Sequence, residues 1–247
     1  MKKKTICFMG AKKIGLQCLK LLWSYCEESS HQLVTVYTNE RGAEIRAFAK
    51  EIGVPICDRL EELEEVDFLI SVQYHRILKK THIDKARELA FNLHMAPLPE
   101  YRGCNQFSFA LLNGDKEFGT TIHKIDEGVD SGDIIAEKRF QIPENCLIDE
   151  LYDLTYDASI ELFREKVPKI VCGHYVSVAQ DSLLKDRSCS LHYRREIEEL
   201  KKIDLNWSEE KILSHIRATS MPGFPPPYAE IGDFKIEFLM NRKPRGN

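Results

Sequence analysis

The sequence contains no stretch of 18 or more apolar residues, which argues against a membrane-spanning helix. It has no excess of positive charge either, because the formal net charge is -4, so we expect no broad attraction to nucleic acid. The eight cysteines are scattered, with no Cys-x-x-Cys pair and no His-Cys spacing of the kind that holds zinc. In a chain of 247 residues these absences favour a soluble globular protein with reduced thiols and without a metal, nucleic-acid or membrane partner.

Two common ligand-binding motifs are also incomplete. The segment from Gly10 to Gly15 follows a predicted strand and opens a predicted helix, but it supplies only two of the three glycines of a G-x-G-x-x-G fingerprint. The acidic loop from Asp126 to Asp133 misses the spacing of a calcium-binding loop. The missing glycine excludes a nicotinamide cofactor. The missing calcium-loop spacing leaves a plain acidic turn as the alternative to a functional loop.

Strand-like and helix-like segments alternate in the first third of the chain. Because the apolar run that begins at Thr5 is too short for a signal peptide, we interpret it as a first buried strand and expect the protein to stay in the cytoplasm. This alternation predicts an α/β fold with a mostly parallel sheet and right-handed crossovers. The predicted strands are 5–9, 32–37, 54–56 and 66–72, and the predicted helices are 15–25 and 41–52.

The remaining pattern predicts two parts. A helix at 105–113, strands at 119–125 and 134–142, and a long helix at 147–170 complete a domain of residues 1–190. Charged helical segments then precede two strands joined at Gly232 and Asp233, which predicts a small C-terminal subdomain of residues 191–247 with a β-hairpin. The last six residues, 242–247, are expected to be a loose tail.

Asn92 and His94 are the first candidate site residues. In the segment 91–95 apolar and polar residues alternate, so on a strand these two side chains share one face about 7 Å apart. Pro97 ends the strand, and polar groups at the end of a buried strand are where α/β proteins place their chemistry. The alternative is a hydrogen-bonded polar pair in the core. Asp130 could complete an Asn-His-Asp set, although spacing alone does not bring its loop to His94.

Together these residues resemble the formyltransferases that use 10-formyltetrahydrofolate. The resemblance is strongest between residues 66 and 143. It lies in the motifs Asn92-x-His94, Leu98-Pro99-x-Tyr101-Arg102-Gly103, Asn113-Gly114, Gly119-x-Thr121-Ile122 and Asp126-x-Gly128-x-Asp130-x-Gly132-Asp133.

The resemblance implies a Rossmann-like sheet flanked by helices and assigns roles to residues. Asn92, His94 and Asp130 would be the catalytic set. The folate pocket would be lined by His75, Arg76, Ile77, Asp126, Glu127, Gly128 and Val129. Without the resemblance, the segment 73–78 is equally consistent with an ordinary connection after a strand.

Within the family the loop that follows Asn92-x-His94 looks most like the short sugar-nucleotide N-formyltransferases. That likeness implies transfer of a formyl group from 10-formyltetrahydrofolate, as co-substrate, to a dTDP-linked amino-dideoxyhexose, with dTDP-4-amino-4,6-dideoxyglucose as the best candidate. Such a product would serve O-antigen or surface polysaccharide synthesis. The enzyme would be a homodimer that needs no metal. The sugar nucleotide would be bound by Tyr101, Arg102, Asn105, Gln106 and Tyr228, although Arg102 could equally hold its loop in place.

The chemistry assigns a task to each catalytic candidate. Asn92 would donate a hydrogen bond to the formyl oxygen as negative charge develops there. His94 would take the proton of the amine or share in stabilising that oxygen, and Asp130 would orient His94.

Three other functions stay open. A methionyl-tRNA formyltransferase would need strong tRNA binding, whereas the charge is negative and only 47 residues follow residue 200. A 10-formyltetrahydrofolate hydrolase would use the same trio with water in place of the amine. A catalytically inactive folate-binding protein would tolerate loss of the trio.

Overall fold

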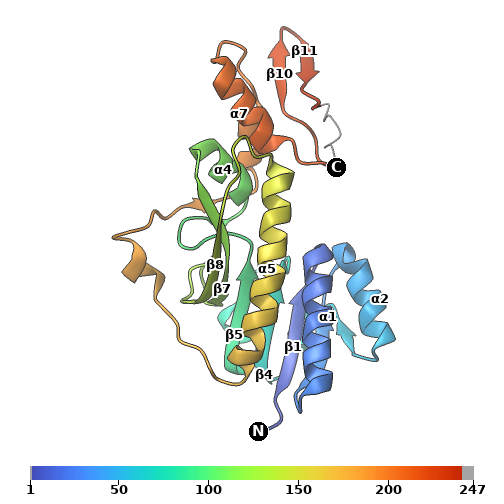
Figure 1. Cartoon of the computed structure of the whole chain (residues 1–247). Helices are drawn as coiled ribbons and strands as arrows, with labels where there is room; N and C mark the ends of the chain where they lie inside the picture. The colour runs from blue at the N-terminus through green and yellow to red at the C-terminus, as the bar shows by residue number, and fades with distance from the viewer. Residues whose placement is uncertain (1, 241–247) are drawn as a thin grey trace, which may run out of the picture.

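The computed structural model describes residues 2–240, so the tail expected at 242–247 lies outside the described residues. A seven-stranded sheet with the order β3-β2-β1-β4-β5-β7-β8 forms its centre (Figure 1). The first five strands in that order are parallel, and β7 and β8 continue the sheet as antiparallel strands. The strands are β1 (Thr5–Gly10), β2 (Gln32–Tyr37), β3 (Ile56–Cys57), β4 (Val66–Val72), β5 (Ala86–His94), β7 (Glu117–Lys124) and β8 (Ile134–Gln141).

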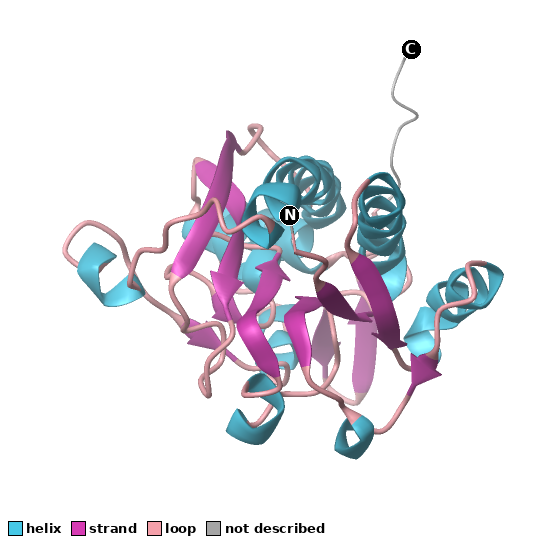
Figure 2. Ribbon diagram, turned by 90° about the horizontal axis from the view of Figure 1, so that it is seen from below, coloured by secondary structure: helices cyan, strands magenta, loops and turns pink. Residues whose placement is uncertain are grey.

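The two long helices, α1 (Lys12–Glu28) and α5 (Ile148–Val171), pack against each other and cover one face of the sheet. Apolar residues recur along α1 at helical spacing, so one stripe of the helix, including Ile14, Leu19 and Leu22, is buried. The opposite face carries only short helices, as Figure 2 shows in the view from below. Its cover includes a 3₁₀ turn (Leu60–Glu62) and α3 (Lys80–Ile83).

The strand order reverses between β1 and β4. From β1 the chain proceeds outward to β2 and β3, and it then returns to add β4 and β5 on the other side. Gly10, at the end of β1, pairs with Val72, at the end of β4. Parallel α/β sheets bind ligands in the crevice outside the carboxyl ends of the strands at such a reversal.

The last part of the chain packs onto the first. The two-residue strand β9 (Leu191–His192) pairs with β6 (Arg102–Gly103), and α7 (Glu209–Thr219) packs on α4 (Gln106–Asn113). Between them lies the short helix α6 (Glu196–Lys201). The antiparallel hairpin of β10 (Tyr228–Ile231) and β11 (Phe234–Glu237) follows, at the top of Figure 1. The hairpin turns at Gly232 and Asp233, as the sequence predicts.

The predicted fold class is confirmed, and several segments differ in detail. The strand expected at 54–56 begins at Ile56, because Pro55 has no backbone N–H and the N–H of Val54 bonds to Ala49. The helix expected at 41–52 starts with a 3₁₀ turn (Glu40–Gly42), and α2 proper is Ala43–Glu51. The loop after His94 contains β6. Among residues 2–240, every helix is too short or too polar to cross a lipid bilayer.

Candidate active site

Asn92 and His94 lie side by side at the carboxyl end of β5. The antiparallel neighbour β7 places His123 directly opposite Asn92, and Thr121 opposite His94. His94 is buried, with 5% of its surface exposed, while Asn92 is half-buried. The predicted polar face therefore exists, and β7 adds a second histidine to it.

Hydrogen bonding sets the protonation pattern of His94. Its Nε2 lies 2.7 Å from the backbone oxygen of Tyr101. A carbonyl oxygen can only accept, so Nε2 carries a hydrogen and donates it. In the neutral ring Nδ1 is then the basic nitrogen, and it lies 3.5 Å from Oδ2 of Asp130. His94 thus holds a proton-accepting atom next to a carboxylate, which can stabilise the imidazolium once a proton has arrived.

His123 is the site residue that the sequence analysis did not identify. Its Nδ1 lies 2.8 Å from the backbone oxygen of Lys124 and so carries a hydrogen. Its Nε2 lies 3.2 Å from Nδ2 of Asn92 and 3.4 Å from Oδ1 of Asp130. In the neutral ring Nε2 can accept a hydrogen of the Asn92 amide, and in the protonated ring it can donate to the carboxylate of Asp130. The signal that could have revealed it is alternation, because Thr121 and His123 share a face of the predicted strand.

The loop between β7 and β8 brings Asp130 to this pair of histidines. Asp130 has a left-handed backbone with φ +51°, and its Oδ2 accepts a hydrogen bond from the N–H of Gly103. The side-chain amide of Gln180 donates to the backbone oxygens of Asp130 (2.8 Å) and Gly132 (2.7 Å). The loop is thus tied to two distant segments, at Gly103 and Gln180.

Asp130 is held in its charged form. Burial alone would raise the pKa of its carboxyl, but the charges of His94 and His123 and the N–H of Gly103 lower that pKa to well below the usual range. The ionised carboxylate of Asp130 therefore lies beside Nδ1 of His94.

Of the residues expected to bind the sugar nucleotide, Arg102 and Tyr101 use their side chains in hydrogen bonds to other residues of the protein. Nε and Nη2 of Arg102 both donate to Oε1 of Gln180, at 3.0 and 2.8 Å, which favours the loop-holding role over phosphate binding. The hydroxyl of Tyr101 is buried against Asp115 and Asn113. Tyr101 contributes to the site through its backbone oxygen instead.

The other three expected substrate contacts lie in different surroundings. The side-chain amide of Asn105 donates to the backbone oxygen of Tyr193 at 2.9 Å and so supports the segment after β9. Gln106 is buried at the start of α4. Tyr228 lies on β10, with the ammonium of Lys235 4.3 Å from its ring centre, and so packs within the hairpin.

The two segments expected to line a folate pocket follow β4 and β7 of the central sheet. His75, Arg76 and Ile77 form an exposed connection after β4, and Ile77 is 72% exposed. The pKa of Lys80, at the start of α3, is raised by its hydrogen bond to Asp84 and, more weakly, by the charge of Glu127.

The acidic loop is internally ordered. Oδ1 of Asp126 accepts hydrogen bonds from the N–H of Gly128 (3.1 Å) and the hydroxyl of Ser131 (2.7 Å). Glu127, Gly128 and Val129 stay exposed at its surface. This arrangement leaves those three residues free to face a ligand.

Comparison with known proteins identifies the central part of the chain. Residues 54–167, which contain the whole Asn92, His94, His123 and Asp130 cluster, match the formyl transferase domain. The chain contains a formyl transferase domain. The methionyl-tRNA formyltransferase of Listeria innocua is 33% identical over 147 residues, which are 56% of this chain and 47% of that protein. The GDP-perosamine N-formyltransferase of Brucella melitensis is 29% identical over 173 residues, or 70% of this chain and 64% of that protein.

This formyl transferase domain also has close structural relatives. The crystal structure of WlaRD, a sugar 3N-formyl transferase in the presence of dTDP and 5-N-formyl-tetrahydrofolate, superimposes with a TM-score of 0.78 at 25% identity and covers 96% of this chain and 85% of that one. By contrast, the chain spans about half the length of the methionyl-tRNA formyltransferases that it matches.

Proposed function

We propose that this protein is a sugar-nucleotide N-formyltransferase that moves a formyl group from 10-formyltetrahydrofolate to the amine of a dTDP-linked amino-dideoxyhexose. The observation that carries the proposal is the convergence of Asn92, His94 and Asp130 at the carboxyl end of β5. Our best candidate for the acceptor is dTDP-4-amino-4,6-dideoxyglucose, for O-antigen or surface polysaccharide synthesis. The similarity to a sugar 3N-formyl transferase over nearly the whole chain supports a sugar acceptor.

His94 is proposed to act as the general base. The reacting amine loses a proton as it attacks, and the neutral ring of His94 offers Nδ1 to receive it because Nε2 already donates to Tyr101. The resulting imidazolium is stabilised on both sides, by the backbone oxygen of Tyr101 and by the carboxylate of Asp130. Asp130 does not itself take the proton, because its pKa is held far below that of an ordinary carboxyl.

Asn92 is proposed to stabilise the formyl oxygen. Its Nδ2 has two hydrogens, and one of them faces Nε2 of His123. That contact fixes the plane of the amide and leaves the other N–H for the oxygen on which negative charge develops. His123 is thus a positioning residue for Asn92.

The residues around the site fit a folate co-substrate. Ile77 and Val129 each expose an apolar side chain, on the loops that follow β4 and β7, which suits the flat ring of a pteridine. His75, Arg76, Asp126, Glu127 and Gly128 complete the proposed folate contacts. When bound, the folate supplies an already activated formyl group.

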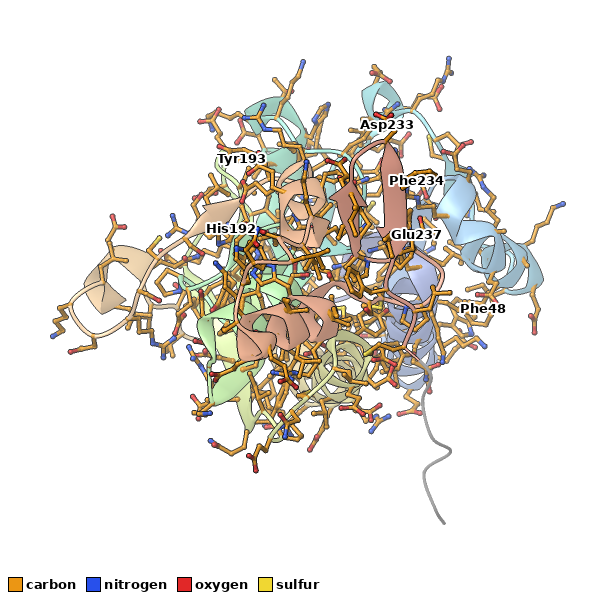
Figure 3. The ribbon with its side chains drawn as sticks, turned by 90° about the horizontal axis from the view of Figure 1, so that it is seen from above. Phe48, His192, Tyr193, Asp233, Phe234 and Glu237 are labelled. Carbon is orange, nitrogen blue, oxygen red and sulfur yellow. The ribbon has the colours of Figure 1, made fainter. Side chains whose placement is uncertain are left out.

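We also propose the following organisation. Residues 1–190 form the catalytic domain and residues 191–247 a C-terminal subdomain. The hairpin exposes Ile231, Phe234 and Ile236, so it offers an apolar surface for a second copy in a homodimer (Figure 3). The protein works in the cytoplasm, without a metal, nucleic acid or membrane as partner.

A formyl-transfer assay tests the function. Purified protein is given 10-formyltetrahydrofolate and one acceptor at a time: dTDP-4-amino-4,6-dideoxyglucose, its galacto and 3-amino isomers, GDP-perosamine, UDP-aminoarabinose, or none. We expect release of tetrahydrofolate that depends on one dTDP-sugar. Release without any acceptor would instead identify a hydrolase.

A second candidate rests on the similarity to the Listeria innocua methionyl-tRNA formyltransferase. The same assay with methionyl-tRNA tests it. Transfer to methionyl-tRNA with no transfer to any sugar nucleotide would replace the proposed function. If every acceptor is inert and folate still binds, the chain is a non-catalytic folate-binding protein.

A further inference from the structure

The backbone of His94 is held by a buried hydroxyl group as well as by strand pairing. His94 is the last residue of β5, and its register partner on β7 is Thr121. The hydroxyl of the neighbouring Thr120 donates to the backbone oxygen of His94 at 2.9 Å. Thr121 in turn donates to the backbone oxygen of Ala96 at 2.8 Å. Two adjacent threonines therefore fix the stretch 94–96, where the chain leaves the sheet.

A serine of α5 completes this arrangement. Consecutive side chains of a strand point to opposite faces, so Thr121 shares the face of His94 and Thr120 lies on the other one. That other face is covered by α5, which packs along β7 (Figure 1). Oγ of Ser159 on α5 lies 2.7 Å from Oγ1 of Thr120. Both residues are 0% exposed, so neither hydroxyl can exchange this contact for bulk water.

The direction of the hydrogens in this pair follows from the acceptors. A backbone oxygen can only accept, so the hydroxyl hydrogen of Thr120 points to His94. The hydrogen between the two hydroxyls must then come from Ser159, which shares it with the backbone oxygen of Thr155 at 2.6 Å. Ser159 thus occupies a lone pair of Thr120 and directs the hydrogen of Thr120 to His94. Hydrogen bonds in such a chain polarise and strengthen one another.

The orientation of this carbonyl group matters for the imidazole. Nε2 of His94 donates to the backbone oxygen of Tyr101, seven residues further along the chain, and Nδ1 lies 3.5 Å from Oδ2 of Asp130. A rotation of the peptide group after His94 would shift the ring relative to the loop that carries Tyr101. A displacement of about 1 Å at a reacting group can cost on the order of 100-fold in rate.

We propose that Thr120 and Ser159 are positioning residues for His94. Their hydroxyl groups fix the carbonyl at the end of β5 and so keep the imidazole between Tyr101 and Asp130, with Nδ1 available to accept a proton. The inference rests on the proposed function for the role of His94 as general base. Apolar side chains of similar shape would fill this space without burying hydroxyl groups. A role in packing therefore needs only the shape of the two side chains, whereas a positioning role needs their hydroxyls.

Variants that separate shape from hydroxyl test the proposal. Thr120→Val keeps the branched shape and removes the hydroxyl, and Thr120→Ser keeps the hydroxyl. Thr155→Val is the matched control, because Thr155 is equally buried on α5 and its hydroxyl donates to the backbone oxygen of Leu151 in its own helix. Nitrogen NMR of the neutral imidazole identifies which ring nitrogen of His94 carries the hydrogen, and loss of the signal in His94→Gln assigns it.

We expect a hydrogen on Nε2 of His94 in the wild type, Thr120→Ser and Thr155→Val, and a mixture of both tautomers in Thr120→Val. In the formyl-transfer assay kcat should fall roughly 5- to 10-fold in Thr120→Val with the KM of the acceptor unchanged, and less than about two-fold in Thr120→Ser and Thr155→Val. Ser159→Ala should lie in between. Its combination with Thr120→Val should be no worse than Thr120→Val alone, because both act through one hydrogen bond.

Wild-type tautomer and turnover in Thr120→Val would overturn the inference, and so would equal losses in Thr120→Val and Thr155→Val. If Thr120→Val does not fold, Ser159→Ala is compared with Thr155→Val, and an unchanged His94 signal and turnover in Ser159→Ala overturns the inference in the same way. The NMR measurement needs no acceptor. It therefore decides the positioning of His94 separately from the acceptor assay, which alone decides the proposed function.

Discussion

Replacing Asp130 with asparagine removes one charge and keeps the shape of the side chain. The carboxylate lies 3.5 Å from Nδ1 of His94 and 3.4 Å from Nε2 of His123. Coulomb's law with an effective dielectric constant of 20 gives about 5 kcal/mol for opposite unit charges at that separation. The Asp130 side chain is 17% exposed, so solvent offsets part of this energy. At 1.4 kcal/mol per factor of ten, we expect kcat to fall roughly 100- to 1000-fold in Asp130→Asn.

The assay follows acceptor-dependent release of tetrahydrofolate with saturating substrates. KM for the acceptor should change little, because the carboxylate acts on the imidazolium that forms during the reaction. Asp133→Asn is the control: its carboxylate lies in the same loop and pairs with Lys124 and Ser177, and that variant should keep near-normal turnover. If Asp130→Asn turns over within a few-fold of the wild type, His94 does not depend on this carboxylate and the mechanism is wrong.

The same substitution has a consequence for stability. Burial opposes the charged form of Asp130, but His94, His123 and the N–H of Gly103 leave its pKa below the ordinary value. The stabilisation from such a group is present above the unfolded-state pKa of about 3.9 and is lost as the pH falls below it. The urea midpoint of Asp130→Asn should therefore fall less between about pH 5 and pH 3 than that of the wild type.

Three further outcomes are expected. His123→Ala should lower kcat about 10-fold, which is less than the 100- to 1000-fold loss expected for Asn92→Ala. Because His123 acts through the Asn92 amide, the double variant should be no worse than Asn92→Ala. Gln180→Ala should cost about 1–3 kcal/mol of unfolding free energy in urea titrations, since it leaves buried partners of the loop unsatisfied. Gly132→Ala should yield poorly folded, inactive protein by circular dichroism and turnover, because a Cβ there would lie 2.0 Å from the backbone oxygen of Lys124.

Local pattern predicts most of the strands and helices, because periodicity and turn chemistry act within a few residues. The strands at 32–37 and 66–72 match the structure residue for residue. The hairpin at Gly232 and Asp233 follows from its turn residues alone. Segments of two residues carry no period, so β6 and β9 were not predictable in this way.

Local sequence patterns predict the candidate site less completely than the strands and helices, because the site depends on pairing between distant segments. Alternation places Asn92 and His94 on one face, but His123 joins them only because β7 runs antiparallel to β5 in one particular register. Arg102 illustrates the same limit. Its sequence context allowed both a phosphate contact and a structural role, and only the position of Gln180, 78 residues away, favours the second.

Gln180 explains why the site needs a part of the chain that has little regular structure. The side-chain oxygen of Gln180 accepts from Arg102, and its side-chain nitrogen donates to the backbone oxygens of Asp130 and Gly132. The acidic loop has no strand partner of its own between Ile125 and Asp133, so these bonds and the N–H of Gly103 hold Asp130 at its distance from His94. A shift of 1 Å would separate the carboxylate from both histidines. The geometry of the catalytic group therefore depends on the segment after α5 as much as on the sheet that carries Asn92 and His94.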